Sequence, residues 1–348
     1  MTLRLDARRP APQLHAMPIP TRHQTPLRSA FLRASIALIL TAPASIAPVT
    51  ATAQGGAAPA SPAPRLMRAG DVDTVPLRNA GVRIAYGRDS LQFGDLRLPN
   101  GATNSNRAPI AIVIHGGCWY SPYASVRNSA PLADALAQAG VATWNVEYRR
   151  YNNAGGGWTG TFRDVADGAD YLRTLAKLYP IDTTRIVLTG HSAGGHLALW
   201  LASRRALDRS SPLFGGTPMP VRGVVSVGGI ADLREFYGRE RNTCGNPAVE
   251  SLLGGVPDSV PARLRDASPI ERLPLGVPSV HIAGDRDFIA PVAVREAYAT
   301  AATARGDNAR VITIVGDGHF EAMTPYKAAG RAVIDAIRDM LGLPSDKH

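Results

Sequence analysis

The apolar residues of this chain fall mainly in short continuous runs. Six runs are rich in β-branched residues and are bounded by turn residues: "IAIVIH" (110–115), "VATWNVEY" (141–148), "RIVLTG" (185–190), "VRGVVSVGG" (221–229), "PSVHIAG" (278–284) and "ARVITIVG" (309–316). Strands that are apolar along their whole length fit a sheet covered on both faces, and such sheets are parallel. The pattern therefore predicts a buried, mostly parallel sheet.

Helical spacing separates these runs. Within 162–179 the apolar residues recur at three- and four-residue steps, which gives a helix one apolar face. Gly160 or Thr161 is expected to cap this helix, with Asp164 favourably placed in its first turn. The other helices are expected over 132–139, 193–204, 292–304 and 325–343. Strands that alternate with helices predict an α/β protein with a doubly wound sheet.

Two segments depart from this alternation. Residues 82–87 and 93–99 have the character of two strands joined by a turn, and they predict an N-terminal antiparallel hairpin at the edge of the sheet. Residues 230–269 are polar, with scattered Gly and Pro, and only "AVESLLGG" has a helical pattern. Because this segment lies between two core strands, we expect a small lid insertion there.

The first 53 residues are typical of an export signal. Arginines precede the apolar stretch "ASIALILTAPASIAPVTATA", which ends in an A-x-A cleavage pattern at Ala53. The stretch is short and broken by prolines, so no stable membrane anchor is expected. Residues 1–53 are therefore predicted to be a signal peptide and the protein to be secreted or periplasmic, with a disordered tail as the alternative. Residues 54–70 are predicted to be a flexible linker and 71–345 one catalytic domain.

Composition and charge narrow the possible partners. The 348 residues are 45% hydrophobic and 19% charged, which is typical of a globular protein. The formal net charge is +10, but residues 1–53 contribute +5 through six arginines and one aspartate. No basic run contains interleaved aromatic residues, so no nucleic-acid partner is predicted. No His, Cys and Asp cluster has metal-ligand spacing, so neither a metal nor a cofactor is predicted.

A serine with glycines on both sides indicates a catalytic residue. Residues Gly190 to Gly194, "GHSAG", form a G-x-S-x-G pattern between a predicted strand and a predicted helix. A nucleophilic serine stands clear of a sheet on such a sharp turn, and the glycines two positions before and after it relieve crowding. The pattern predicts that Ser192 is a nucleophile.

A serine hydroxyl needs a base, and the base needs an orienting group. His319 follows the last predicted strand, and Asp287 follows the strand before it. Both lie at carboxyl ends of parallel strands, where such sheets place their sites. We therefore expect His319 to be the base and Asp287 the orienting acid. Asp285 and Asp317 are the competing carboxylates.

The segment "HGGCW" (115–119) follows the first predicted parallel strand. Its two glycines allow backbone N–H groups to turn toward a reacting oxyanion. The expected donors are the N–H groups of Gly117, Cys118 and Ala193, with Gly116 as a possible substitute. His115 is expected to hold this loop through hydrogen bonds.

Four motifs resemble the α/β-hydrolase superfamily: "HGGCW", "NVEYRR", "GTFRDVADGADYL" and "GHSAGGHLALW". They are most similar to the BD-FAE (feruloyl and acetyl xylan esterase) and kynurenine formamidase-like groups, near the hormone-sensitive-lipase-like carboxylesterases. The resemblance spans about residues 80–342. It implies an α/β-hydrolase fold with Ser192 as nucleophile, His319 as base and Asp287 as orienting acid. Many relatives carry a third glycine or an aromatic residue in place of Cys118, so acyl-pocket specificity need not follow either group.

The motifs and the resemblance together predict a serine hydrolase that cleaves carboxylic esters through an acyl-enzyme. The expected substrate is a small-molecule or acylated-carbohydrate ester. Two alternatives stay open: an aryl formamidase or peptidase on the same triad, and a non-catalytic binding protein on a hydrolase scaffold. The oligomeric state is not predicted.

The chain has two cysteines, Cys118 in the predicted oxyanion loop and Cys244 in the predicted lid. An even number of cysteines in an exported protein favours a disulfide bond. The lid insertion of this fold commonly covers the active-site mouth, so the two cysteines are expected to pair. Two unrelated thiols are the alternative.

Overall fold

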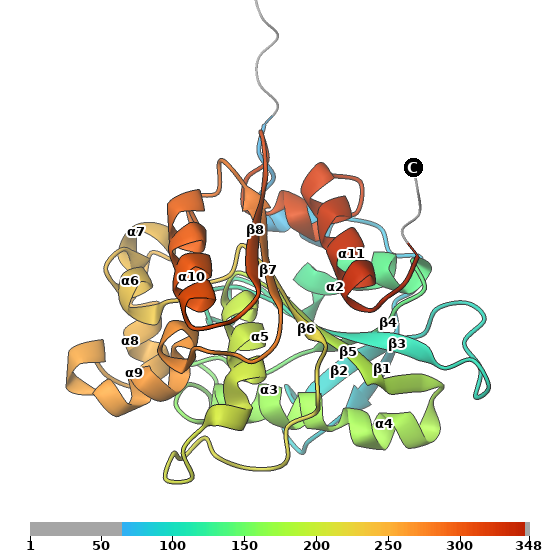
Figure 1. The fold of residues 1–348 in the computed structure, drawn as a ribbon, viewed down its shortest axis with the longest axis horizontal. Helices are drawn as coiled ribbons and strands as arrows, with labels where there is room; N and C mark the ends of the chain where they lie inside the picture. Colours follow the sequence, from blue (N-terminus) through green and yellow to red (C-terminus); the bar gives the residue numbers. More distant parts are fainter. Residues whose placement is uncertain (1–64, 345–348) are drawn as a thin grey trace, which may run out of the picture. The chain divides into compact units, whose positions relative to one another are not determined.

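The computed structural model describes residues 65–344. The predicted signal peptide and the first part of the predicted linker lie outside the described residues. The centre of the described part is an eight-stranded sheet with the order β1-β2-β4-β3-β5-β6-β7-β8 (Figure 1). The strands are β1 (Val82–Ala85), β2 (Phe93–Arg97), β3 (Ala108–Ile114), β4 (Ala142–Val146), β5 (Ile181–His191), β6 (Gly223–Val227), β7 (Ser279–Gly284) and β8 (Ala309–Ile314).

The strand directions match the sequence prediction. Strands β3 to β8 are parallel to one another, and β1 and β2 form an antiparallel hairpin at one edge. Strand β2 joins the parallel part by antiparallel pairing with β4. The predicted α/β class, with a mostly parallel sheet and an N-terminal hairpin, is confirmed.

Helices cover both faces of the sheet (Figure 1). One layer contains α1 (Ala69–Asp73), α2 (Val126–Gln138) and α11 (Ala328–Met340). The other contains α3 (Gly160–Asp170), α4 (Leu172–Leu178), α5 (Ala193–Ser203) and α10 (Val292–Ala304). The continuous apolar strands are therefore buried on both sides, which is the reason for their sequence pattern.

The predicted helix over 162–179 is wrong in two respects. It is divided into α3 and α4, and neither Gly160 nor Thr161 caps it, because both are already helical. The Thr161 hydroxyl instead donates a hydrogen bond to the carbonyl of Arg149. Asp164 is buried in an ion pair with the Arg149 guanidinium, 2.7 Å away. Contacts with a distant segment therefore replace the expected local capping.

Two other boundaries differ from the predictions. Helix α2 begins at Val126 and not at 132, because Ser125 caps it by accepting a hydrogen bond from a backbone N–H group. The start of the domain also lies earlier than 71. The N–H group of Met67 donates to the Glu321 carboxylate at 2.6 Å, so this end of the predicted linker contacts the domain.

The insertion 230–269 contains several short helices, although only one was expected. They are α6 (Leu233–Tyr237), α7 (Glu240–Thr243), α8 (Ala248–Leu253) and α9 (Pro261–Ala267). Apolar residues of α6 and α8, such as Phe236 and Leu252, belong to the hydrophobic core. Helices of four to seven residues are too short to show a clear apolar period, which explains why the sequence did not reveal them.

Among residues 65–344, no helix is both long enough and apolar enough to cross a membrane.

Candidate active site

The turn after β5 holds Ser192 in an unusual backbone conformation with a positive φ angle, φ 56° and ψ −119°. Neighbouring backbone approaches this turn very closely. A Cβ atom on Gly190 would lie 2.3 Å from the carbonyl oxygen of Gly194, and one on Gly194 would lie 2.1 Å from that of Ile114. The glycines are thus required by close packing, as the G-x-S-x-G pattern predicts.

His319 and Asp287 come together from neighbouring loops. His319 follows β8, Asp287 follows β7, and the His319 Nδ1 atom lies 2.8 Å from Asp287 Oδ2. Both side chains are almost completely buried. The competing carboxylates, Asp285 and Asp317, accept hydrogen bonds from backbone N–H groups elsewhere. Asp287 is therefore the carboxylate that can orient the His319 ring.

Asp287 is held in its charged form. Its Oδ1 atom accepts hydrogen bonds from the N–H groups of Ile289 and Ala290, at 2.8 and 2.9 Å. Burial by itself raises the pKa of Asp287, but the charge of His319 and these hydrogen bonds outweigh it and lower the pKa to about 2. A permanently charged carboxylate stabilises a protonated imidazole ring beside it.

A cavity of about 410 Å³ lies beside Ser192 and His319. Ser192 and His319 both line it, together with Gly117 and Cys118 from the loop after β3 and residues 241–245 of the lid. The serine, the histidine and the predicted oxyanion loop therefore share one accessible space.

The predicted oxyanion loop has an unusual backbone. Gly117, Cys118 and Trp119 have consecutive positive φ angles of 97°, 51° and 54°. Gly116 packs against the serine turn, since a Cβ atom on it would lie 3.0 Å from Ser192 Cβ. Ala193 is the first residue of α5, so its N–H group has no partner within the helix. Of the four candidate donors, Gly117 and Cys118 line the cavity, whereas Gly116 and Ala193 do not.

The family was identified by comparison with known proteins. The BD-FAE family model matches residues 95–300, which is more than half of the chain. The chain belongs to the BD-FAE family. The match includes Ser192 and Asp287 and ends before His319.

Two curated proteins resemble this BD-FAE chain. Esterase LipQ of Mycobacterium tuberculosis is 24% identical over 241 residues, which cover 68% of this chain and 56% of LipQ. The probable isoprenylcysteine alpha-carbonyl methylesterase ICMEL1 of Oryza sativa subsp. japonica is 26% identical over 156 residues, which cover 44% of this chain and 33% of ICMEL1. The chain thus spans between a third and somewhat over half of the length of these relatives.

Solved structures resemble it in fold. A truncated carbohydrate esterase from gut microbiota has a TM-score of 0.63 at 23% identity, covering 75% of this chain and 95% of that one. Esterase 2 of Thermogutta terrifontis, with propionate bound, has a TM-score of 0.62 at 18% identity, covering 78% and 98%. The likeness confirms the predicted α/β-hydrolase fold.

A buried polar network supports the predicted oxyanion loop of this BD-FAE protein. The Nε2 atom of His115 lies 2.8 Å from Glu147 Oε1, and its Nδ1 atom lies 2.9 Å from the Gly116 carbonyl oxygen. Glu147 also contacts the guanidinium of Arg150. Burial raises the pKa of Glu147, but His115 and Arg150 outweigh burial and lower it to about 2. His115 therefore holds the loop, as expected, and Glu147 and Arg150 are partners that the "NVEYRR" motif contained without revealing their role.

His191, inside the G-x-S-x-G turn, supports His319. Its Nε2 atom lies 2.9 Å from the His319 carbonyl oxygen, and the two ring centroids are 4.4 Å apart. The pKa of His191 is lowered to about 3. Complete burial is the larger cause, and the electrostatic effect of the nearby His319 is the smaller one. His191 is therefore neutral at neutral pH.

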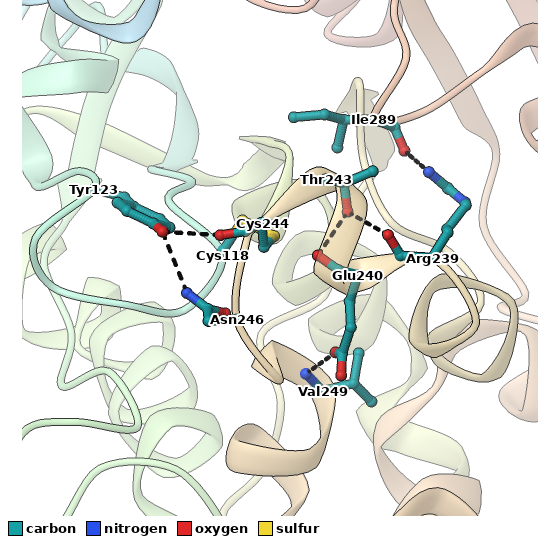
Figure 2. The surroundings of a disulfide bond; sticks show 9 residues. All are labelled: Cys118, Tyr123, Arg239, Glu240, Thr243, Cys244, Asn246, Val249 and Ile289. Atoms are coloured by element: carbon teal, nitrogen blue, oxygen red, sulfur yellow. Dashed lines mark hydrogen bonds between the residues drawn. A yellow bond between two sulfur atoms is a disulfide. The ribbon is translucent and has the colours of Figure 1, made fainter.

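Two arginines hold the loop that carries Asp287. Arg239, on the lid, donates a hydrogen bond to the carbonyl oxygen of Ile289 at 2.7 Å (Figure 2). It also donates to the carbonyl oxygen of Phe288 at 3.4 Å. Arg295, on α10 and 2% exposed, donates to the carbonyl of Ala290 at 3.0 Å. Sequence reasoning missed both arginines because bonds to backbone carbonyls leave no residue pattern.

The lid is also attached to the oxyanion loop. A disulfide bond joins Cys118 to Cys244, with Cα atoms 6.1 Å apart, so the expected pairing is present (Figure 2). Next to it, the Tyr123 hydroxyl donates a hydrogen bond to the Cys244 carbonyl at 2.8 Å. With the Arg239 contacts, the lid is thus bound to both the oxyanion loop and the Asp287 loop.

Within residues 65–344 no group of three or more His, Cys, Asp or Glu side chains is arranged to hold a metal ion.

The disulfide predicts a measurable stability difference. A variant with Cys118→Ser and Cys244→Ser is expected to lose about 4 kcal/mol of unfolding free energy, because the bond joins residues 126 apart and restricts the unfolded chain. Urea unfolding of the two proteins measures this loss. Reductant is expected to destabilise the wild type and leave the variant unaffected.

The control is Tyr123→Phe, which removes the neighbouring hydrogen bond and keeps the disulfide. This variant is expected to lose about 1 kcal/mol of unfolding free energy. Equal unfolding midpoints for the wild type and the double serine variant would contradict a stabilising disulfide.

Proposed function

We propose that this protein is a serine hydrolase that cleaves carboxylic esters, with Ser192, His319 and Asp287 as its catalytic triad. The observation that carries the proposal is the 2.8 Å contact between His319 and Asp287, together with the cavity that His319 shares with Ser192. This is the arrangement of groups that activates a serine hydroxyl.

The proposed reaction has two halves. The Ser192 hydroxyl attacks the ester carbonyl while His319 Nε2 takes its proton, and Asp287 stabilises the charged ring. Backbone N–H groups of Gly117, Cys118 and Ala193 stabilise the negative oxygen of the tetrahedral intermediate. His319 then gives the proton to the departing alcohol. Water, activated by the same histidine, releases the acid from the acyl-enzyme.

Ester cleavage is favoured over the formamidase and peptidase alternatives by the relatives. LipQ and ICMEL1 are both named as ester-cleaving enzymes, and they support ester chemistry for this chain. The carbohydrate esterase similarity fits an acylated carbohydrate as one substrate class. The ionised Asp287 and the aligned His319 favour catalysis over a non-catalytic binding role.

The nucleophile can be tested by substitution. Ser192→Ala is expected to lower kcat for a p-nitrophenyl ester by about 10⁶-fold, because the acyl-enzyme cannot form. Thermal unfolding should show that the variant remains folded. Turnover close to the wild-type rate in the folded variant would exclude Ser192 as the nucleophile.

The orienting acid can be tested with two matched variants. Asp287→Asn is expected to lower kcat by about 10⁴-fold, because an amide favours the wrong tautomer of His319. Asp285→Asn is the control and should change kcat less than about tenfold, since its carboxylate bonds to the backbone N–H group of Gly316. The opposite ranking in steady-state kinetics would refute the assignment.

We further propose that the protein is exported and cleaved after Ala53. The Cys118–Cys244 disulfide supports an oxidising compartment. Expression in a host with secretion machinery is expected to yield a mature protein that begins near Gln54, as measured by intact mass. Retention of Met1 in a cytoplasmic product would refute export.

A further inference from the structure

A second cavity adjoins the active-site cavity. Its volume is about 550 Å³, and it shares His319 and Phe320 with the first cavity. Its other walls are residues 65–68 of the N-terminal segment and two residues of the Asp287 loop, Arg286 and Phe288. We call this second cavity the arginine groove.

The arginine groove has an excess of positive charge. Arg65, Arg68 and Arg286 line it, and all three are exposed. Asp71 forms a two-point ion pair with Arg65, at 2.9 and 3.1 Å. Within the part of the chain that the structure describes, neither Arg68 nor Arg286 has a salt bridge through its guanidinium. The charge of Arg68 also helps to lower the pKa of Asp71, so this one carboxylate acts on both arginines of the segment. Three arginines still line the groove against one ion-paired carboxylate, which leaves a net positive charge to attract an anion.

The nearby buried carboxylate, Glu321, acts electrostatically on Arg65, the arginine that is already paired with Asp71. Glu321 accepts hydrogen bonds from the backbone N–H groups of Met67 and Gly318, at 2.6 and 2.9 Å. It is 2% exposed and does not line the groove. These hydrogen bonds fix residues 65–68 against the domain, so that Arg65 and Arg68 line the same cavity as His319.

The groove also offers an apolar surface. Phe288 is 62% exposed, which is unusual for a large apolar side chain, and Phe320 forms part of the same wall. Covering an exposed phenylalanine with a ring of a ligand removes apolar surface from water. The groove therefore combines a surface for a ring with charges for an anionic group on that ring.

The position of the groove identifies the part of the substrate that it would hold. In the proposed reaction His319 returns a proton to the departing alcohol, so the alcohol lies beside His319. The acyl group lies at Ser192 and the oxyanion loop, in the first cavity. We propose that the arginine groove binds the alcohol part of an ester whose alcohol carries a carboxylate on a ring. This inference rests on the proposed ester hydrolysis.

The test compares two acetate esters of the same shape, 4-(carboxymethyl)phenyl acetate and its neutral amide, 4-(carbamoylmethyl)phenyl acetate. The methylene group separates the charge from the reacting bond. For the wild type, kcat/KM is expected to be about tenfold higher for the anionic ester, since two exposed charge contacts together contribute roughly this factor. The preference should decrease as sodium chloride increases.

The decisive variant is Arg68→Gln with Arg286→Gln. In it, the ratio of the two kcat/KM values is expected to fall from about ten to about one. Arg310→Gln is the matched control, because Arg310 is an exposed arginine in a different cavity. The control should keep the wild-type ratio.

The proposal would be overturned by equal turnover of both esters by the wild type, by an unchanged ratio in the double variant, or by an equal loss in Arg310→Gln. A charge preference for phenyl hemisuccinate over phenyl succinamate, without one on the alcohol side, would also overturn it, because that charge lies on the acyl group.

A binding measurement separates this proposal from the proposed function. Calorimetry with Ser192→Ala should show that 4-hydroxyphenylacetate binds about tenfold more tightly than 4-hydroxyphenylacetamide, and that Arg68→Gln with Arg286→Gln removes the difference. If this selective binding is observed but the wild-type protein hydrolyses no ester, the groove proposal is supported and ester hydrolysis is refuted. If the protein hydrolyses esters but shows no selective binding, ester hydrolysis is supported and the groove proposal is refuted.

Discussion

The close approach of backbone at the Ser192 turn is the constraint on which the rest of the site depends. The positive-φ conformation of Ser192 places the chain against the end of β3 and leaves no room for side chains at Gly190 and Gly194. Such a conformation is costly for a residue with a side chain and persists only when its surroundings hold it in place. Here it directs Ser192 to the carboxyl edge of the sheet, where the loops after β3, β7 and β8 also end.

Each of those loops is held by its own buried polar contacts. His115 and Glu147 hold the loop after β3 through hydrogen bonds, and Arg295 holds the Asp287 loop in the same way. The lid then joins the two loops through the Cys118–Cys244 disulfide and through Arg239. A lid fixed at both sides limits how far the cavity can open. The site is therefore formed before binding, and it selects ligands by their shape and charge.

Sequence patterns predicted the features that depend on local rules. Continuous apolar runs identified the parallel strands, the G-x-S-x-G turn identified Ser192, and strand-end positions identified Asp287 and His319 as neighbours. The lid helices were missed because they are too short to show a period. Arg239 and Arg295 were missed because carbonyl oxygens at distant positions determine their role. The capping of α3 was predicted incorrectly because Gly160 and Thr161 already lie inside the helix, where the Thr161 hydroxyl bonds to the carbonyl of Arg149.

The central claim is that Ser192 is the one activated serine of this site. Reaction of the mature protein with a fluorophosphonate, followed by peptide mass spectrometry, tests it most directly, because the reagent bonds to a serine only where a base and oxyanion donors activate it. We expect a single adduct, on Ser192, whose formation Asp287→Asn strongly slows. An adduct on another serine, or none on the folded wild-type protein, would contradict it.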